Sequence, residues 1–246
     1  MKNRIILALD VDELERAREL AGLLKNDAGL FKIGKQLFTR YGPQAIAMVH
    51  SLGGDVFLDL KFHDIPHTVA RAAEEAVRHG VFMFNVHASG GFEMMQQAVS
   101  AVQAKAAALN QRKPLVLAVT VLTSLSAADL STLGINSPVE EQVVRLARLA
   151  RSAGVDGVVA SPHEIEMIKK ECGRDFLVVT PGVRPAASAA GDQKRVLTPG
   201  EALRKGADYI VVGRPVIGAP DPVAAVQAII KEIEKQKTDD REQKTD

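Results

Sequence analysis

The chain of 246 residues is poor in aromatic side chains, carries almost no net charge and contains a single cysteine. Without Trp and with only two Tyr, it is poorly supplied with the stacking groups that single-stranded nucleic acids require. Its 31 basic and 30 acidic side chains form no basic stripe that would favour nucleic acid or an anionic membrane surface. Cys172 has no internal disulfide partner, and no signal peptide or apolar run of 18 residues is present. We therefore expect a cytoplasmic protein with neither nucleic-acid nor membrane partners.

What the chain does contain is a regular alternation of short β-rich runs with helix-like segments. The eight runs are Ile5–Leu9, Leu30–Ile33, Val56–Leu60, Phe82–Val86, Leu115–Val121, Gly157–Val159, Phe176–Val179 and Tyr209–Val212. Apolar strands that alternate with helices are typical of a parallel sheet with a covered outer face.

Eight such units predict an α/β fold, a single (β/α)8 TIM barrel over residues 1–234, since such barrels typically need about 250 residues. A doubly wound open sheet is the alternative, but no Gly-x-Gly-x-x-Gly follows the first run. The polar residues 235–246 are expected to form a disordered tail.

The sequence predicts several helix starts. At each, a Ser or Thr occupies the N-cap, a proline the first helical position and a glutamate the third. Ser137, Ser161 and Thr198 are the three expected N-caps, and Asp221 opens the last helix in the same way but without the glutamate. A further short helix is expected over Ala127–Leu133.

The third β-rich run ends in an unusual concentration of charge. Asp59 and Lys61 are two residues apart, so they share one side of a strand, where unpaired charges are costly to bury. Asp64 follows in a loop, because Pro66 keeps the residue before it out of helical geometry. A structural ion pair at a strand end and a catalytic group are both compatible with this segment taken alone.

Other strand ends add further polar residues, and in a TIM barrel the carboxyl ends of the strands carry the active site. Asp10 ends the first run, Lys32 interrupts the second, and Thr123 and Ser124 follow the fifth. Near the last two runs, where many barrels bind phosphate, lie Arg184, Gly213 and Arg214. The loop 181–196, which contains Gln193, has the composition of a mobile lid over an anionic group.

A metal site is not expected. His63 and His67 flank Pro66 and do not share a helical face, and His87 follows the fourth run. Lys32 and Lys61 already supply the positive charge that a cation would bring.

With these residues in place, the sequence resembles the orotidine 5′-phosphate decarboxylase family over residues 4 to 230. The third-run segment Leu58-Asp59-Leu60-Lys61-Phe62-His63-Asp64-Ile65-Pro66 carries most of the resemblance. The remaining matching segments surround Asp10, Lys32, Thr68, Thr123, Arg184, Gln193 and Gly213.

The resemblance implies cofactor-independent decarboxylation of orotidine 5′-phosphate to UMP. Lys61 would protonate C6, and Lys32, Asp59 and Asp64 would complete the catalytic charges. The implied substrate-binding residues are Asp10, Lys32, Asp59, Asp64, Ile65, Thr68, Thr123, Ser124, Arg184, Gln193, Gly213 and Arg214. It also implies a homodimer with shared active sites, in which Asp64 and Thr68 reach the partner's barrel.

Two alternatives stay open. A sister family shares Asp-x-Lys-x-x-Asp but uses a metal in sugar-phosphate decarboxylation or epimerisation, and it has an acidic ligand where this chain has Lys32. The second alternative is a non-catalytic nucleotide-binding barrel, since fold alone does not establish function.

Overall fold

The computed structural model describes residues 4–185 and 197–242. Its parallel strands close into a barrel in the order β1 to β8, which confirms the predicted fold. The strands are β1 (Ile5–Ala8), β2 (Leu30–Gly34), β3 (Asp55–Phe62), β4 (Met83–His87), β5 (Leu115–Val119), β6 (Gly157–Val159), β7 (Leu177–Pro181) and β8 (Tyr209–Val212). Each of the eight predicted runs corresponds to one strand, with ends displaced by at most a few residues.

Contacts divide the chain into two compact units, Met1–Val56 with Thr180–Asp246, and Phe57–Val179. We call them unit 1 and unit 2 and describe each by itself. The predicted single domain over 1–234 stays a prediction.

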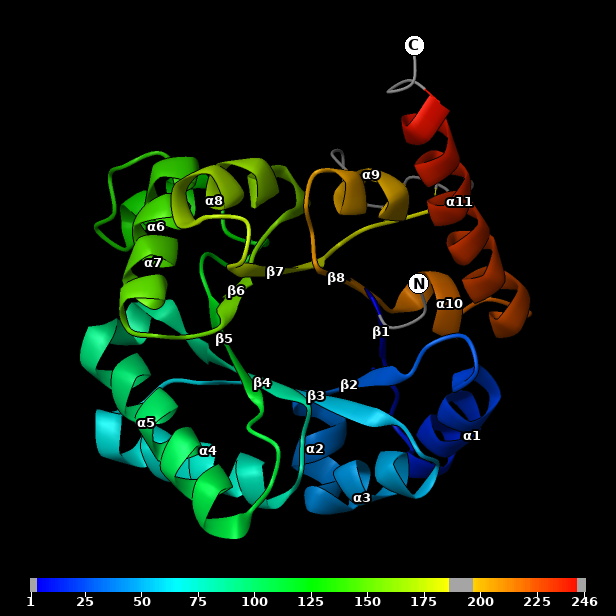
Figure 1. The fold of residues 1–246 in the computed structure, drawn as a ribbon, viewed down its shortest axis with the longest axis horizontal. Coiled ribbons are helices and arrows are strands. Elements are labelled where there is room, and N and C mark those ends of the chain that lie inside the picture. Colours follow the sequence, from blue (N-terminus) through cyan, green and yellow to red (C-terminus); the bar gives the residue numbers. More distant parts are fainter. Residues whose placement is uncertain (1–3, 186–196, 243–246) are drawn as a thin grey trace. The chain divides into compact units, whose positions relative to one another are not determined.

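In unit 1, β1 is the central strand of a three-stranded segment. Ile6 pairs with Leu30 of β2 and with Val211 of β8. The helices of this unit are α1 (Leu14–Leu24), α2 (Lys35–Tyr41), α3 (Pro43–Ser51), α9 (Pro199–Arg204), α10 (Arg214–Ile217) and α11 (Pro222–Glu242). Helices α9 and α11 pack against each other (Figure 1).

In unit 2, β3 to β7 pair in sequence order, with Phe84 opposite Val116 and Val158 opposite Val178. The helical elements are α4 (Pro66–Arg78), η2 (Ala88–Gly90), α5 (Gly91–Leu109), α6 (Ala127–Thr132), α7 (Val139–Ser152), η3 (Pro162–Glu164) and α8 (Ile165–Cys172). Helix α4 buries a stripe of small apolar side chains, which include Val69, Ala73 and Val77, at the spacing of one helical face. It lies alongside α5 (Figure 1).

The capping predictions hold at three of the four expected N-caps. Ser161 and Thr198 form complete capping boxes with the glutamates three residues later, and Asp221 accepts a hydrogen bond from the backbone N–H of Ala224. The prediction for Ser137 was wrong: the cap of α7 is Pro138, one residue later, and the buried Ser137 hydroxyl makes no hydrogen bond with the described residues.

The C-terminal segment also differs from the expectation. Helix α11 continues past residue 234 to Glu242, where the sequence predicted a disordered tail. Lys, Gln and Glu have high helix propensity, and polar composition alone does not end a helix. Residues 243–246 lie outside the described part of the chain.

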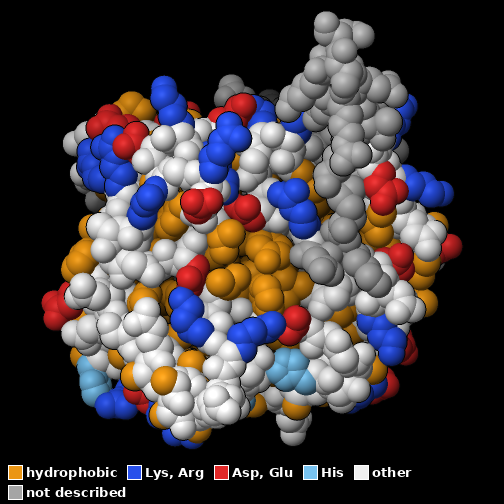
Figure 2. Space-filling view, in the orientation of Figure 1, with side chains coloured by type: hydrophobic (Ala, Val, Ile, Leu, Met, Phe, Trp, Pro, Cys, Tyr) orange, Lys and Arg blue, Asp and Glu red, His pale blue; other side chains and the backbone are white. Residues whose placement is uncertain are grey.

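On the face drawn in Figure 2, basic and acidic side chains are interspersed among the described residues. None of the described helices is long and apolar enough to cross a bilayer.

Candidate active site

Strand β3 does not pair regularly with β4 along its whole length. Leu58 lies opposite Phe84, whereas Phe62 lies opposite Val86, so the register shifts between these pairs. Within the shifted segment Lys61 has a φ of 55°, a left-handed conformation that side chains other than Gly rarely adopt. A bulge of this kind re-aims side chains at the end of a strand.

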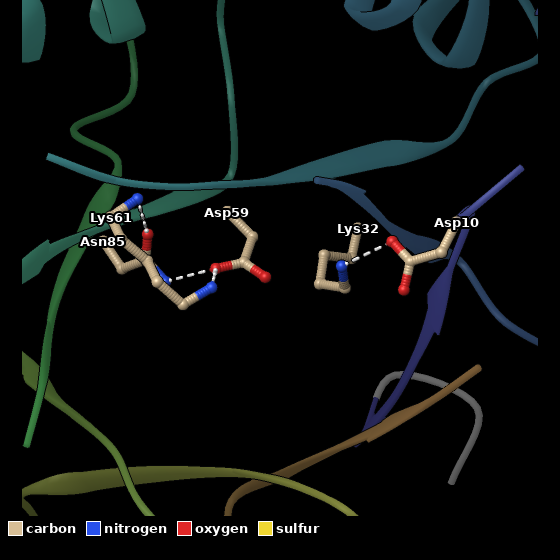
Figure 3. Close-up of polar contacts among 5 residues, drawn as sticks. All are labelled: Asp10, Lys32, Asp59, Lys61 and Asn85. Atoms are coloured by element: carbon tan, nitrogen blue, oxygen red, sulfur yellow. Dashed lines mark hydrogen bonds and ion pairs between the residues drawn. The ribbon is translucent and has the colours of Figure 1, made fainter. Parts of the chain in front are cut away.

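The bulge brings together the charged pair predicted from the sequence. Lys61 Nζ donates to Asp59 Oδ1 at 2.6 Å (Figure 3), and the side chains are only 22% and 13% exposed, respectively. Two partly buried charges are tolerated when they are paired and hydrogen-bonded. The pair therefore places a cation and an anion side by side near the carboxyl end of β3.

Asn85 of β4 completes this cluster. It is 1% exposed, and its Oδ1 accepts from the backbone N–H of Lys61 at 2.8 Å, while its Nδ2 donates to Asp59 Oδ1 at 2.7 Å (Figure 3). No role was predicted for Asn85 from the sequence. The available signal was a side chain with low β-propensity in an otherwise apolar strand.

A second charged pair lies in unit 1. Lys32 Nζ donates to Asp10 Oδ1 at 2.8 Å (Figure 3), and the backbone N–H of Leu9 donates to the Lys32 carbonyl oxygen at 3.0 Å. The Lys32 side chain is 11% exposed, whereas that of Asp10 is 47% exposed. Gly34 leaves room for this pair, since a Cβ there would lie 2.9 Å from Lys32 Nζ and 3.0 Å from Asp10 Oδ1.

Asp64 and Ile65 directly precede α4, Thr68 lies in its first turn, and all three are exposed. The Asp64 carboxylate accepts a hydrogen bond from the backbone N–H of Ile65 at 2.7 Å and makes no ion pair with Lys61 in the described chain. The structure therefore does not bring Asp64 to the lysine of its own chain.

The predicted pyrimidine and phosphate residues occupy the loops after the strands. Thr123 and Ser124 follow β5 and are exposed, and Arg214 is exposed at the start of α10. Gly213 precedes it, with Ala8 Cβ 3.4 Å from where its own Cβ would lie. The Arg184 backbone N–H donates to the Leu197 carbonyl oxygen at 3.2 Å. Gln193 lies outside the described residues.

The described histidines and the cysteine form neither a metal-binding cluster nor a reactive thiol. The rings of His63 and His87 lie 5.4 Å apart between centroids, and no cluster of three His, Cys, Asp or Glu side chains suited to a metal occurs within the described ranges. Burial raises the pKa of the Cys172 thiol above its ordinary value, which favours the neutral form over the nucleophilic thiolate.

Comparison with known proteins covers almost the whole chain. A family model described as orotidine 5′-phosphate decarboxylase / HUMPS family matches residues 3–229. Orotidine 5′-phosphate decarboxylase of Moorella thermoacetica is 58% identical over 234 residues, which span 95% of this chain and 93% of the relative. That of Geotalea uraniireducens is 55% identical over 94% of this chain and 95% of the relative.

Solved structures give the same result. The crystal structure of orotidine 5′-phosphate decarboxylase from Lactobacillus acidophilus matches with a TM-score of 0.81 and 39% identity, covering 94% of this chain and 99% of that one. That from Pyrococcus horikoshii OT3 matches with a TM-score of 0.73 and 27% identity, covering 94% and 99%.

Proposed function

This chain belongs to the orotidine 5′-phosphate decarboxylase / HUMPS family, and we propose that it converts orotidine 5′-phosphate to UMP and CO2 with Lys61 as the proton donor to C6. This is the last step of UMP biosynthesis. The lone, buried Cys172 supports a reducing cytoplasm as the place where it acts.

The observation that carries the proposal is the Asp59–Lys61 pair. Loss of CO2 leaves an electron pair at C6 that the pyrimidine ring cannot delocalise well, so the site needs a cation there that can also give up a proton. Lys61 meets both needs, and its ammonium is ion-paired with Asp59 at 2.6 Å. Because lysines supply the positive charge, the reaction requires neither a metal nor an organic cofactor.

Asp59 has a second role in this proposal. It faces the substrate carboxylate, and the repulsion between the two is relieved as CO2 leaves. Lys32 and Asp64 complete the catalytic charges, with Asp64 adding a second carboxylate and Lys32 a second cation.

The other predicted residues bind the parts of the substrate that do not react. Ribose hydroxyls are bound by Asp10, Lys32, Asp64 and Thr68. Ser124 binds the pyrimidine edge, with Thr123 and Ile65 beside the substrate. The phosphate is bound by Arg184, Gln193, Gly213 and Arg214, and its binding energy can be used at the reacting carbon.

The decisive experiment is to mix purified protein with orotidine 5′-phosphate and EDTA and to follow the loss of pyrimidine absorbance. Turnover that resists EDTA is expected. Turnover that appears only with added divalent metal and a sugar phosphate would assign the chain to the metal-dependent branch instead. Binding of the nucleotide without turnover would show that the protein is a non-catalytic nucleotide-binding barrel.

We further propose a homodimer in which Asp64 and Thr68 serve the partner's active site. Both are exposed on their own chain, Asp64 makes no ion pair there with Lys61, and the neighbouring apolar Ile65 is 67% exposed. Pro66 begins α4 directly after this segment. A two-fold interface would place each copy of the segment against the other subunit.

Mixing two inactive variants tests this arrangement. Lys61→Ala and Asp64→Ala subunits are allowed to exchange, so that each hybrid dimer has one site with both lesions and one with neither. Random pairing makes about half the dimers hybrid, so activity should recover to about a quarter of wild type. Verified hybrids that stay inactive would show that Asp64 serves its own chain.

A further inference from the structure

The β3 bulge leaves a gap in the strand pairing that a side chain fills. Between the pairs Leu58–Phe84 and Phe62–Val86, three residues of β3 face only Asn85 of β4. The extra residues take the Lys61 backbone N–H out of the regular ladder, and a buried N–H requires another acceptor. The side-chain oxygen of Asn85 provides it at 2.8 Å.

The orientation of the Asn85 amide is dictated by its neighbours. A backbone N–H can only donate and the Asp59 carboxylate can only accept, so the amide oxygen must face Lys61 and the amide nitrogen must face Asp59. Asp59 Oδ1 thereby accepts from both Asn85 Nδ2 and Lys61 Nζ.

One buried side chain therefore holds the lysine in two ways. It stabilises the left-handed backbone of Lys61, and it fixes the carboxylate to which the Lys61 ammonium is bound. Left-handed conformations of residues other than Gly persist where the surrounding structure imposes them, and they concentrate at functional sites.

We propose that Asn85 is a positioning residue of the decarboxylation, acting through Lys61 and Asp59 without touching the reacting atoms. The inference rests on the proposed function, because it assigns Lys61 the proton transfer. Without Asn85 the lysine relaxes toward an ordinary strand conformation, and its ammonium leaves the position from which it reaches C6. A displacement of about 1 Å in such a group can cost about 100-fold in rate.

Three variants separate positioning from stability. Asn85→Ala removes both hydrogen bonds. Asn85→Asp keeps the acceptor for the Lys61 N–H but sets a carboxylate against Asp59. The matched control is Asp156→Ala, because Asp156 also accepts from a backbone N–H, that of Val116 at 2.8 Å, and from a lysine, Lys113, at 2.9 Å.

For Asn85→Ala, kcat should fall about 100-fold, while the affinity for UMP, which lacks the carboxylate, should stay within about threefold. Asp156→Ala should lower the melting temperature but keep kcat within about threefold of wild type. The inference is overturned if Asn85→Ala keeps kcat within about threefold, or if Asp156→Ala loses as much activity as Asn85→Ala.

The pH profile of Asn85→Asp gives a signature that a structural role alone would not produce. Two adjacent carboxylates raise the pKa of one of them, and the protonated carboxyl reproduces the acceptor and donor of the amide. The ratio of its kcat to that of wild type should therefore rise as the pH falls, whereas the ratio for Asn85→Ala should stay flat. A flat ratio for Asn85→Asp would overturn the inference, even if Asn85→Ala did not fold. Failure of wild-type protein to decarboxylate orotidine 5′-phosphate would instead refute the proposed function.

Discussion

Two side chains of unit 2 each accept a hydrogen bond from a backbone N–H and also contact a charged side chain, but they lie at opposite ends of their strands. Near the carboxyl end of β4, Asn85 accepts from the backbone N–H of Lys61 and donates to Asp59. Directly before β6, at its amino end, Asp156 accepts from the backbone N–H of Val116 and from Lys113.

The difference lies in the backbone that each contact supports. Val116 pairs regularly with β4, and its carbonyl oxygen accepts from the Asp156 backbone N–H at 2.9 Å. Lys61 is left-handed within a bulge; the other left-handed residue besides Gly among those described, Asn110, is an ordinary helix C-cap. The amino-end contact extends the sheet, whereas the carboxyl-end contact maintains a strained conformation. A hydrogen bond from a backbone N–H to a side chain thus supports a regular sheet at the amino end and a bulge at the carboxyl end.

The largest contrast is expected between two lysines of unit 2, Lys61 near the carboxyl end of β3 and Lys113 before the amino end of β5. Lys61→Ala should lower kcat at least about 1,000-fold, since both the general acid and the cation that stabilises the transition state are lost. Lys113→Ala should lower the melting temperature and leave kcat within about threefold. Absorbance assays and thermal unfolding of both variants check this. Retention of more than a tenth of wild-type activity by Lys61→Ala would remove Lys61 from the mechanism.

A smaller effect is expected from two arginines of unit 1, Arg214 after the carboxyl end of β8 and Arg4 before the amino end of β1. Arg214→Ala should cost about 1.5–3 kcal/mol of transition-state stabilisation, about 10- to 150-fold in kcat/KM, through a lost charge-assisted contact with phosphate. At the amino end, Arg4 donates to the carbonyl oxygens of Asp208 and Ala207, so Arg4→Ala should affect stability alone.

The control for Arg214 is the substrate. With orotidine, which lacks the phosphate, Arg214→Ala should lose much less activity than with orotidine 5′-phosphate. Equal losses with both substrates would show that Arg214 does not bind the phosphate.

A still smaller effect is expected from adding one methyl group at Gly34. The new Cβ would lie 2.9 Å from Lys32 Nζ, and the ammonium, at the end of a flexible side chain, can move away at little cost to the fold. We expect kcat/KM to fall about tenfold with little change in the melting temperature, because the Asp10–Lys32 pair is displaced.

The matched control is Gly22→Ala, which adds the same methyl group in helix α1, where nothing lies within 4 Å of it. It should stabilise the protein by about 0.5–1 kcal/mol and leave activity unchanged. If Gly34→Ala behaves in the same way, the exact position of the Asp10–Lys32 pair does not matter for catalysis.

These contrasts also show what the sequence could predict. The eight strands were predictable because each is a short apolar run between helical segments, and Asp59 and Lys61 because charges are conspicuous at the end of such a run. Strand alternation assumes a regular backbone, however, so it could not reveal the bulge or the left-handed Lys61. The contacts of Asn85 were missed for the same reason, since its side chain accepts from the Lys61 backbone N–H within the bulge.

The smallest effect on activity, and a clear one on stability, is expected from Glu164, a carboxyl group that follows β6. It is 8% exposed, and burial raises its pKa from 4.5 to about 7, against the opposing effect of the hydrogen bond it accepts from the Ser161 backbone N–H at 2.9 Å. A perturbed pKa near strand ends is often taken as a sign of catalysis, yet structural groups produce it too. Here the carboxyl belongs to a capping box, so we expect its titration to alter folding alone.

Because the folded protein favours the protonated form, the stabilising contribution of Glu164 is complete below pH 4.5 and is lost as the pH rises through about 7. The difference between these two values corresponds to about 3 kcal/mol. Glu164→Gln stays neutral and can still accept from Ser161, as glutamine does in other capping boxes. Denaturant unfolding of both proteins from pH 5 to 8 should show Glu164→Gln gaining on wild type as the pH rises, with kcat within about twofold throughout. Glu201→Gln, the same change in the less buried box of Thr198, controls for the substitution itself. Parallel stability curves for Glu164→Gln and wild type would rule out the buried carboxylate as a source of pH dependence. A large fall in the kcat of Glu164→Gln would instead show that Glu164 takes part in the activity.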